Sequence, residues 1–305
     1  MDTPAESTSW FDELWPRLIA YSGIGYVVTA YAVSRWLTRC SPADLTPPAL
    51  CQRVDSLSCQ TADGITLHGW CVEPMSPRAS VVLFHGMRLN RSALLDRVEF
   101  LCDAGYRCVL FDHRAHGQSG GHLTSFGYHE RHDVAAVAEL VARYWPNQPR
   151  AALGNSMGAA ALCFAGNVAH LFAAVVLESM YHDLDSAFRH RVGRGMPGWF
   201  AHFRRGIRCF TEYRLGMSIH EVSPAEHVVN LAPQPVLLLT GSNDPHAPPH
   251  EVRAIADRIP HCSEFHVIDG AGHHGLCEHG GDPYRDLILG FLAKHLFARR
   301  QSRAA

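Results

Sequence analysis

Eight short strand-like segments constrain what this 305-residue chain can fold into more than any other feature. The first two flank Asp63-Gly64, a pair that is typical of a β-hairpin turn. From residue 80 onward, apolar segments alternate with segments of helical periodicity, which predicts an α/β fold with a mostly parallel sheet and helices on both faces. The strands are expected at 54–61, 65–72, 80–84, 107–111, 151–154, 174–178, 236–240 and 264–268, and the helices at 92–103, 129–144, 157–165, 250–259 and 284–298.

The chain divides into an N-terminal segment, 1–50, and one α/β domain, 51–305. The first part ends in a proline-bearing linker, and the second is interrupted at 180–222, after the sixth expected strand. Within this insertion, residues 182–214 hold seven arginines against three acidic residues. An insertion at the strand end where α/β sheets bind ligands is expected to form a small helical lid.

An uncharged stretch of 17 residues, 18–34, lies between Arg17 and Arg35. This length is at the short end of what crosses a bilayer. Trp15 and Trp36 lie 21 residues apart, about 31 Å along a helix, which suits aromatic side chains at two membrane interfaces. The segment therefore predicts a single-pass transmembrane helix at about 16–36.

Two alternatives for this segment are a helix that packs on the domain or a partner, and a cleaved signal peptide. The acidic residues that precede it disfavour the signal peptide. If the helix spans a bilayer, Arg35 and Arg39 on its C-terminal side place the α/β domain in the cytoplasm. The alternative location is cytoplasmic and soluble.

Charge and cysteine content exclude several classes of protein. The formal net charge of −2 provides no field that would recruit nucleic acid. The ten cysteines are scattered and form no C-x-x-C pair, so neither a zinc ribbon nor a thioredoxin-like motif is present. We expect free, mostly buried thiols in a reducing compartment.

The pattern G-x-S-x-G occurs at Gly154-Asn155-Ser156-Met157-Gly158. It follows a predicted strand and precedes a predicted helix, as a nucleophile elbow requires. In such an elbow the serine hydroxyl is exposed, and the amide of Met157 points at a developing oxyanion. The alternative is a glycine-rich turn with a spectator serine.

A serine nucleophile needs a base and a carboxylate that orients it. Asp244 and His273 each follow a predicted strand, and the order Ser156, Asp244, His273 is that of serine hydrolases with parallel sheets, with gaps of 88 (244 − 156) and 29 (273 − 244) residues. His274 is an alternative base, although the glycine-preceded His273 suits the loop better. Glu178, at the end of a strand, is an alternative carboxylate.

The segment His85-Gly86-Met87 follows the strand expected at 80–84. An apolar strand that ends in His-Gly would present the backbone N–H of Met87 as a second oxyanion donor. We interpret the His85 imidazole as a group that anchors this loop rather than as a catalyst.

Together these motifs resemble the α/β-hydrolase superfamily, and most of all its branch of monoacylglycerol-lipase-like and serine-aminopeptidase-like domains, which includes single-pass membrane hydrolases. The resemblance extends over about 55–298 and includes a loop, FDHRAHGQSG at 111–120, that is similar to the D-x-R-G-H-G-x-S loop of that branch, with Ala115 where glycine is common. It continues through Thr-Ser-Phe-Gly at 124–127 and Glu-Arg-His-Asp at 130–133.

The resemblance implies that Ser156 is the nucleophile, His273 the base and Asp244 the acid. It gives a structural role to four side chains of the loop, Asp112, Arg114, His116 and Ser119. A zinc site is the less favoured interpretation of four histidines in this region, His113, His116, His129 and His132.

The sequence thus predicts a serine hydrolase that cleaves a carboxylic ester, lipid-like or a small acyl ester, without a cofactor or metal. The alternatives are a serine peptidase or amidase of the same fold and a membrane-associated binding protein without catalysis. The expected partners are an ester substrate and, through residues 16–36, a membrane. The substrate-binding residues and the oligomeric state are left open.

Overall fold

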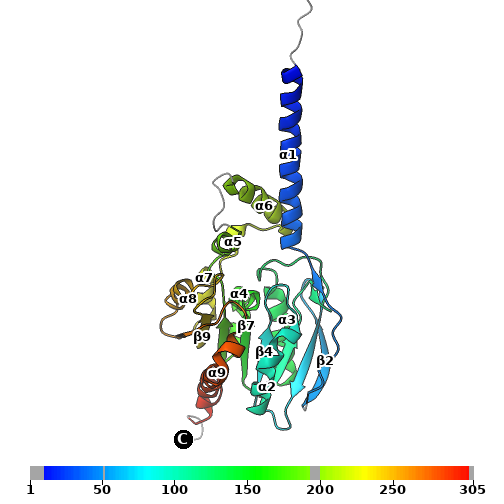
Figure 1. Ribbon diagram of the computed structural model, residues 1–305. Helices are drawn as coiled ribbons and strands as arrows, with labels where there is room; N and C mark the ends of the chain where they lie inside the picture. The colour runs from blue at the N-terminus through cyan, green and yellow to red at the C-terminus, as the bar shows by residue number, and fades with distance from the viewer. Residues whose placement is uncertain (1–9, 51, 193–199, 302–305) are drawn as a thin grey trace, which may run out of the picture. The chain divides into compact units, whose positions relative to one another are not determined.

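One eight-stranded sheet organises the larger part of the computed structural model, which describes residues 10–50, 52–192 and 200–301, with the side chains of 10–21, 190–192, 200–201 and 298–301 left out. The strand order is β10-β9-β8-β7-β4-β5-β3-β2, and the six strands from β10 to β5 run parallel (Figure 1). The strands are β2 (Arg53–Gln60), β3 (Thr66–Glu73), β4 (Ala79–Phe84), β5 (Tyr106–Phe111), β7 (Arg150–Asn155), β8 (Ala174–Glu178), β9 (Val236–Gly241) and β10 (Ser263–Ile268). The predicted α/β fold with a mostly parallel sheet is confirmed, and all eight expected strands occur.

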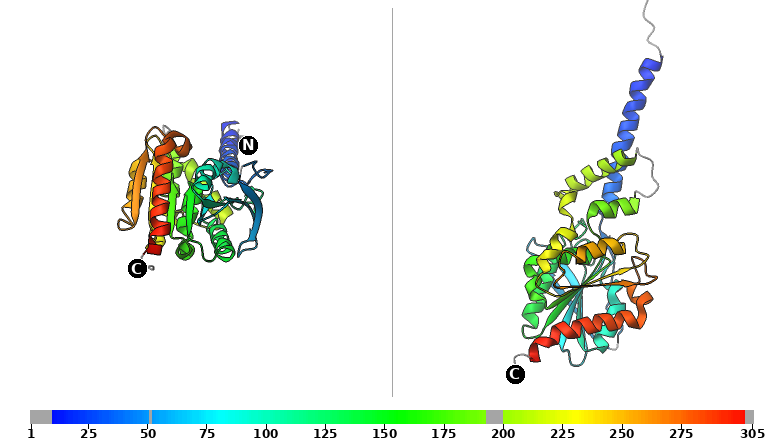
Figure 2. Two further views of the ribbon diagram at one scale, coloured as in Figure 1. Left: turned by 90° about the horizontal axis from the view of Figure 1, so that it is seen from below. Right: turned by 90° about the vertical axis from the view of Figure 1, so that its left-hand side faces the viewer.

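Helices cover both faces of this sheet (Figure 2). The central strands are apolar on both sides, so alternate residues enter opposite cores. Val82 and Phe84 of β4 pack with helices α3, α4 and α8, whereas Val81 and Leu83 pack with α2 and α9. The helices are α2 (Leu95–Asp103), α3 (Arg131–Tyr144), α4 (Met157–Phe164), α7 (Pro224–His227), α8 (Pro249–Ala256) and α9 (Leu276–Gln301), with 3-10 turns η1 (Arg91–Leu94), η2 (Gly166–Leu171) and η4 (Val228–Leu231).

The N-terminal edge of the sheet is an antiparallel hairpin. Strands β2 and β3 pair from Arg53↔Glu73 to Gln60↔Thr66, around the predicted Asp63-Gly64 turn. The preceding segment, expected as a linker, contains the short strand β1 (Ser41–Pro42), which pairs in parallel with β6 (His116–Gly117). Backbone pairing therefore ties this part of the linker to the 112–119 loop.

The described residues divide into two units, of which the first contains the sheet and comprises 39–192 and 220–301. The second consists of 10–38 and 200–219, namely α1 (Trp10–Leu37), α6 (Phe200–Leu215) and η3 (Ile219–Glu221) in part. The insertion expected as a lid at 180–222 is thus helical in its described parts. Its first helix, α5 (Leu184–Val192), belongs to the sheet unit, and α6 belongs with α1.

Within the second unit, α6 packs along the C-terminal half of α1 (Figure 1). The rings of Tyr26 and Phe203 meet edge to face at 5.9 Å. Directly after the end of α1, the Thr38 hydroxyl accepts a hydrogen bond from Arg214 Nε at 3.3 Å. Among the helices that the structure describes, we find none that combines the length and apolarity needed to cross a membrane.

Candidate functional site

Ser156 lies at a sharp turn between strand β7 and helix α4. Its φ of 51° is in the left-handed region, which is unfavourable for a residue with a β-carbon. Two backbone hydrogen bonds hold it there. The Ser156 amide donates to the carbonyl of Glu178 at 2.8 Å, and its own carbonyl accepts from the Ala160 amide at 3.1 Å. Such strain, maintained by the surrounding structure, is typical of a nucleophile elbow.

The glycines on each side of Ser156 are required by close packing. A β-carbon on Gly158 would lie 2.3 Å from the carbonyl oxygen of Phe84, at the end of β4. One on Gly154 would lie 2.6 Å from the Ala159 amide nitrogen. The elbow pattern is therefore a steric requirement, because no larger side chain fits while β4, β7 and α4 remain this close.

The structure brings Ser156, His273 and Asp244 together at the carboxyl ends of β7, β9 and β10. The distance between Ser156 Oγ and His273 Nε2 is 3.0 Å. On the other side of the imidazole, His273 Nδ1 lies 2.9 and 3.0 Å from the two carboxylate oxygens of Asp244. The atom near Ser156 belongs to His273 and not to His274, whose ring lies edge-on at 5.0 Å from that of His273.

The carboxylate of Asp244 is buried and held in its charged form. Burial alone would raise its pKa, but the hydrogen bond and charge of His273 and the amides of His246 and Ala247 outweigh that effect and place the pKa below the ordinary 3.8. A carboxylate accepts hydrogen bonds and does not donate them, so Nδ1 of His273 carries the proton. Nε2 is then free to accept the proton of the Ser156 hydroxyl.

The segment His85–Met87 passes directly against the elbow. A β-carbon on Gly86 would lie 3.0 Å from Asn155 Oδ1 and 3.4 Å from the β-carbon of Ser156. Its neighbour Met87, and Met157 at the first position of α4, are the two residues predicted to donate amides to an oxyanion. Met157 directly follows Ser156 in the chain and Met87 directly follows Gly86, and the role of both amides as oxyanion donors stays a prediction.

The imidazole of His85 fixes the conformation of this segment. Its Nε2 accepts the amide N–H of His113 at 3.0 Å, so Nδ1 carries the proton and donates to the Gly86 carbonyl at 2.7 Å. Burial lowers the pKa of His85 well below 6.5, and the charges of His113 and His116 add to this. The imidazole stays neutral, which agrees with the predicted anchoring role.

The loop from Asp112 to Ser119 supports the same region. Asp112 accepts from the amide and guanidinium of Arg91 and from the Gln118 amide at 2.9 Å. His116 Nε2 accepts a hydrogen bond at 3.1 Å from the amide of Arg88, the residue that follows Met87. The Ser119 hydroxyl donates to the Asp112 carbonyl at 2.7 Å. These contacts give the loop residues the structural function implied by the family resemblance.

Arg114 and Glu130 fix the following segment. Arg114 is paired with both Asp133 and Asp63. Glu130 is fully buried and accepts hydrogen bonds from the Thr124 and Ser125 hydroxyls and from the amides of Ser125 and Gly127. Burial would raise the pKa of Glu130, but the hydrogen bonds from the Ser125 hydroxyl and amide, together with the nearby His113, lower it below 4.5. The segment 124–133 is thus held together by the buried carboxylate of Glu130 and the groups that donate hydrogen bonds to it.

Glu178 does not contact His273 and serves a different purpose. Its buried carboxylate accepts from Arg97 of α2 at 2.8 Å, from Asn155 Nδ2 at 3.3 Å and from the hydroxyl of Tyr284 in α9. This network, Arg97–Glu178–Tyr284, connects both helices of one face of the sheet to the residue before Ser156. The alternative in which Glu178 orients the base has no support in this geometry.

The sequence did not predict this network or the neighbour His246, whose ring lies 5.0 Å from that of His273. A signal existed for Arg97, because it is an arginine within an otherwise apolar face of a helix. The four histidines considered for zinc do not form a metal-ligating group among the described residues. Instead, the rings of His113 and His116 pack edge-on against His85 at 5.0 and 5.2 Å.

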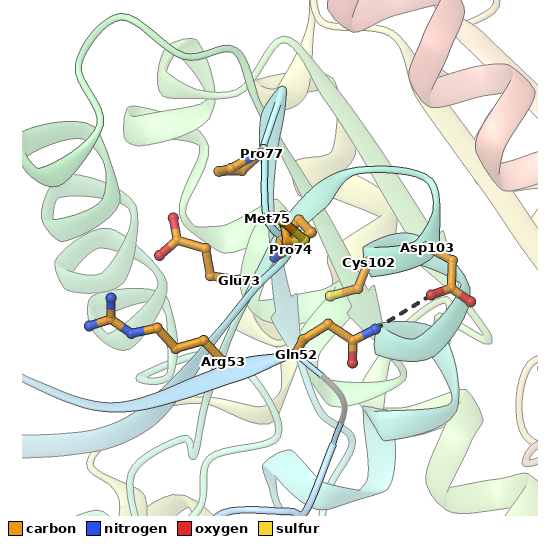
Figure 3. Close-up of a pocket in the computed structure, with 8 residues that line it drawn as sticks. All are labelled: Gln52, Arg53, Glu73, Pro74, Met75, Pro77, Cys102 and Asp103. Carbon is orange, nitrogen blue, oxygen red and sulfur yellow. Dashed lines mark hydrogen bonds between the residues drawn. The ribbon is translucent and has the colours of Figure 1, made fainter.

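A surface cavity of about 560 Å³ lies elsewhere on the sheet unit (Figure 3). It is formed where β3 ends and β4 begins, and Gln52 Nε2 donates to Asp103 Oδ1 across it at 3.4 Å. Parallel strands β4 and β5 start at this edge, whereas Ser156 follows the opposite end of β7. None of the lining residues belongs to the Ser156 cluster, so this cavity is separate from the candidate active site.

Two family models match the chain. Residues 75–209 match the model described as serine aminopeptidase, S33, and residues 216–300 match the model described as TAP-like protein. Among relatives in sequence, the uncharacterized protein YqkD of Bacillus subtilis is 27% identical over 243 residues, which are 76% of this chain and 77% of YqkD. The uncharacterized protein YfhR of Salmonella typhi is 26% identical over 266 residues, 80% of this chain and 83% of YfhR.

Solved structures share the fold. A structure of the Pyrococcus furiosus esterase Pf2001 matches with a TM-score of 0.70 at 22% identity, over 85% of this chain and 98% of the esterase. A thermophilic esterase from Thermogutta terrifontis matches with a TM-score of 0.55 at 23% identity, over 79% of this chain and 99% of that chain. With the eight-stranded, mostly parallel sheet, these matches show that the chain has the α/β-hydrolase fold.

Proposed function

We propose that this protein is a serine hydrolase that cleaves a carboxylic ester through an acyl-enzyme intermediate. The observation that carries the proposal is the continuous hydrogen-bonded line from Ser156 Oγ through His273 to the buried Asp244. A serine hydroxyl is unreactive near neutral pH unless a positioned base removes its proton. Here the base, its tautomer and the strained nucleophile are already aligned.

The proposed reaction has two halves. Ser156 Oγ attacks the ester carbonyl while its proton passes to His273 Nε2, and the amides of Met87 and Met157 bind the oxyanion that forms. The tetrahedral intermediate collapses, and the leaving alcohol receives the proton from His273. Water then attacks the acyl-enzyme with His273 again as base, the acid is released, and Ser156 regains its proton. Asp244 stabilises the imidazolium in both halves.

The choice of an ester rests on the charges of the insertion and on the structural relatives. Two insertion carboxylates have an arginine partner within the same helix, Asp185 with Arg189 and Glu212 with Arg208. An aminopeptidase would need carboxylates of this kind to bind the free amine of its substrate. Because these two are paired with arginines, their charges favour an ester over a peptide substrate. Two of the structural neighbours are named esterases, which supports a small acyl ester as the first substrate class to test.

A fluorophosphonate probe tests the chemistry directly. The wild type should react in a one-to-one ratio, and Ser156→Ala should not react and should lose about 10⁴-fold or more of its kcat on short p-nitrophenyl esters. Ser179→Ala is the matched control, because Ser179 also has a positive φ, follows β8 and is buried. It should keep its labelling. A folded wild type that does not react with the probe would exclude a serine hydrolase and leave the non-catalytic alternative.

A serine aminopeptidase is the second candidate, because residues 75–209 match the family model of that description. The same Ser156 cluster would attack an amide. Parallel assays with p-nitrophenyl esters of graded acyl length and with aminoacyl p-nitroanilides distinguish the two. Turnover of the anilides with no turnover of any ester would favour the peptidase and contradict the ester proposal.

A further inference from the structure

The unit formed by α1 and α6 has an apolar surface that its own packing does not cover. Ile24, Val27, Val28 and Tyr31 follow helical spacing on one face of α1, and their exposed fractions are 59%, 48%, 60% and 39%. A helix on the surface of a soluble protein normally turns such a face toward a core. Residues 18–34 of this helix carry no charged side chain, and the apolar face ends at Arg35.

Tyr31, at the end of this row, contacts α6, because its ring meets that of Phe210 edge to face at 5.6 Å. The other contacts with α6 lie on a different face of α1. Tyr26 donates a hydrogen bond to the His202 carbonyl at 2.8 Å and packs against Phe203. Further along, Ser34 accepts from the Thr211 hydroxyl at 3.2 Å, and Ser34 and Thr211 are both buried. The contact between the two helices thus involves Tyr31 and the buried residues but leaves the side chains of Ile24, Val27 and Val28 exposed.

The unit as a whole, residues 10–38 and 200–219, carries a net positive charge, with six arginines against the three acidic residues Asp12, Glu13 and Glu212. Between residues 22 and 38 and between 202 and 219 there are five arginines and one glutamate. The glutamate, Glu212, is already paired with Arg208, whereas Arg35 and Arg205 are exposed. An apolar helix face beside clustered arginines is the combination that binds anionic lipid surfaces.

The position of α6 decides between crossing a bilayer and lying on it. Phe203 packs against Tyr26, which is the midpoint of the uncharged stretch 18–34. Arg204 and Arg205 follow directly, so a bilayer centred on that stretch would hold both guanidinium groups near its middle, where arginine is strongly disfavoured. A surface-bound arrangement keeps these groups at the headgroups.

We propose that the α1–α6 unit binds the surface of an anionic lipid membrane, with Ile24, Val27 and Val28 inserted among the acyl chains and the arginines at the phosphates. This binding does not depend on the proposed hydrolase chemistry. It makes the second unit a membrane-docking element, with α6 supplied by the insertion that follows β8.

Flotation of the full-length protein with vesicles tests the proposal. The wild type should float with vesicles of phosphatidylcholine containing about one third phosphatidylglycerol, and much less with phosphatidylcholine alone or in high salt. Ile24→Asp/Val28→Asp should weaken this partitioning about tenfold or more. Met75→Asp is the matched control, because Met75 is a fully exposed apolar residue of the sheet unit, and it should float as the wild type does.

A second variant and two further measurements complete the test. Arg205→Glu should weaken binding to the anionic vesicles about fivefold or more and leave thermal unfolding unchanged. Ser156→Ala should float normally, which separates this proposal from the hydrolase proposal. Equal flotation of the double aspartate variant, or retention in vesicles after alkaline carbonate, would overturn surface binding. A lower mass of that variant in light scattering, without flotation of the wild type, would identify a second copy of the chain as the occupant instead.

Discussion

At the scale of single residues, the orientation of one imidazole decides how the proposed nucleophile is activated. His273 and His274 are adjacent in the chain, and both rings are near the site, yet the hydrogen bond to Ser156 Oγ is made by His273 Nε2. Its Nδ1 is fixed by both oxygens of Asp244. Adjacent residues on an extended loop point in different directions, so they cannot replace one another in this bond.

Substituting the two histidines separately tests this assignment. His273→Ala should lower kcat on a short ester about 10⁴-fold or more, because the serine loses its base. His274→Ala should change kcat less than about threefold. Initial rates under saturating substrate check both, with thermal unfolding as the control for folding. A larger loss for His274→Ala than for His273→Ala would show that the base was assigned to the wrong residue.

Gly86 offers a test of the predicted oxyanion donors. A β-carbon there would press on Asn155 Oδ1 at 3.0 Å, so the segment must move by a few tenths of an ångström and carry the Met87 amide with it. Loss of one oxyanion donor costs about 10²–10³ in rate, so a displaced donor should cost about tenfold in kcat with KM little changed. Gly290→Ala, in open space on α9, is the control and should leave kcat unchanged. An unchanged kcat for Gly86→Ala would argue against a donor at Met87.

At the scale of elements, the Arg97–Glu178–Tyr284 network fastens α2 and α9 to the strand end beside the nucleophile. Removing one partner of a buried ion pair leaves the other charge uncompensated, which typically destabilises by about 3–5 kcal/mol. Glu178→Gln should therefore lower the free energy of unfolding by about 3 kcal/mol in urea denaturation. Glu264→Gln removes the exposed pair with Lys294 and should cost about 0–1 kcal/mol. Equal effects of the two substitutions would contradict the structural role of the network.

The 124–130 loop should make stability depend on pH. The pKa of Glu130 is lower in the folded protein than its ordinary 4.5, so folding favours the charged form. Its contribution is complete above about pH 4.5 and is lost as the pH falls through the lowered folded value. Glu130→Gln should thus melt well below the wild type at pH 7, and the gap should narrow below about pH 4.5. Melting temperatures between pH 7 and 3 measure the gap, and a constant gap would contradict this role.

The sequence predicted the features that depend on interactions between residues close in the chain, and it missed those that depend on distant residues. The strands and the loops of Ser156, Asp244 and His273 were predictable, because apolar runs mark parallel strands and such strands end at one edge of a sheet. The network was not, because its ion pair joins residues 81 positions apart and its tyrosine bond spans 106. The strand β1 was also missed, since its two residues pair with an equally short partner and leave no pattern.

At the scale of the whole molecule, the main departure from expectation is where the insertion belongs. Its arginine-rich composition suggested one lid over 180–222, but α6 forms a unit with α1, through contacts such as the bond from Thr211 to Ser34, 177 positions away. The periodicity of one helix does not indicate which other helix it will pack against. The uncharged stretch that suggested a membrane span lies within α1, and α1 packs against α6.

The cysteines allow a test that reports on both units at once. Nine are free in the described residues, and Cys51 lies outside them. Cys40 and Cys209 are exposed, one in each unit, whereas Cys71, Cys108 and Cys163 are buried. Burial raises the pKa of Cys71 to about 12 and that of Cys163 further, so their reactive thiolate forms are scarce at pH 8.

Titration of the native protein with Ellman's reagent at pH 8 should therefore show a fast phase that includes the thiols of Cys40 and Cys209. Cys40→Ser/Cys209→Ser should shorten that phase by two thiols, because these are the two exposed cysteines among the described residues. In guanidinium chloride without reductant, all ten cysteines of the wild type should react if no disulfide exists. Fewer than ten would contradict the prediction of free thiols. A fast phase of unchanged size in the double serine variant would contradict the exposure of Cys40 and Cys209 in this structure.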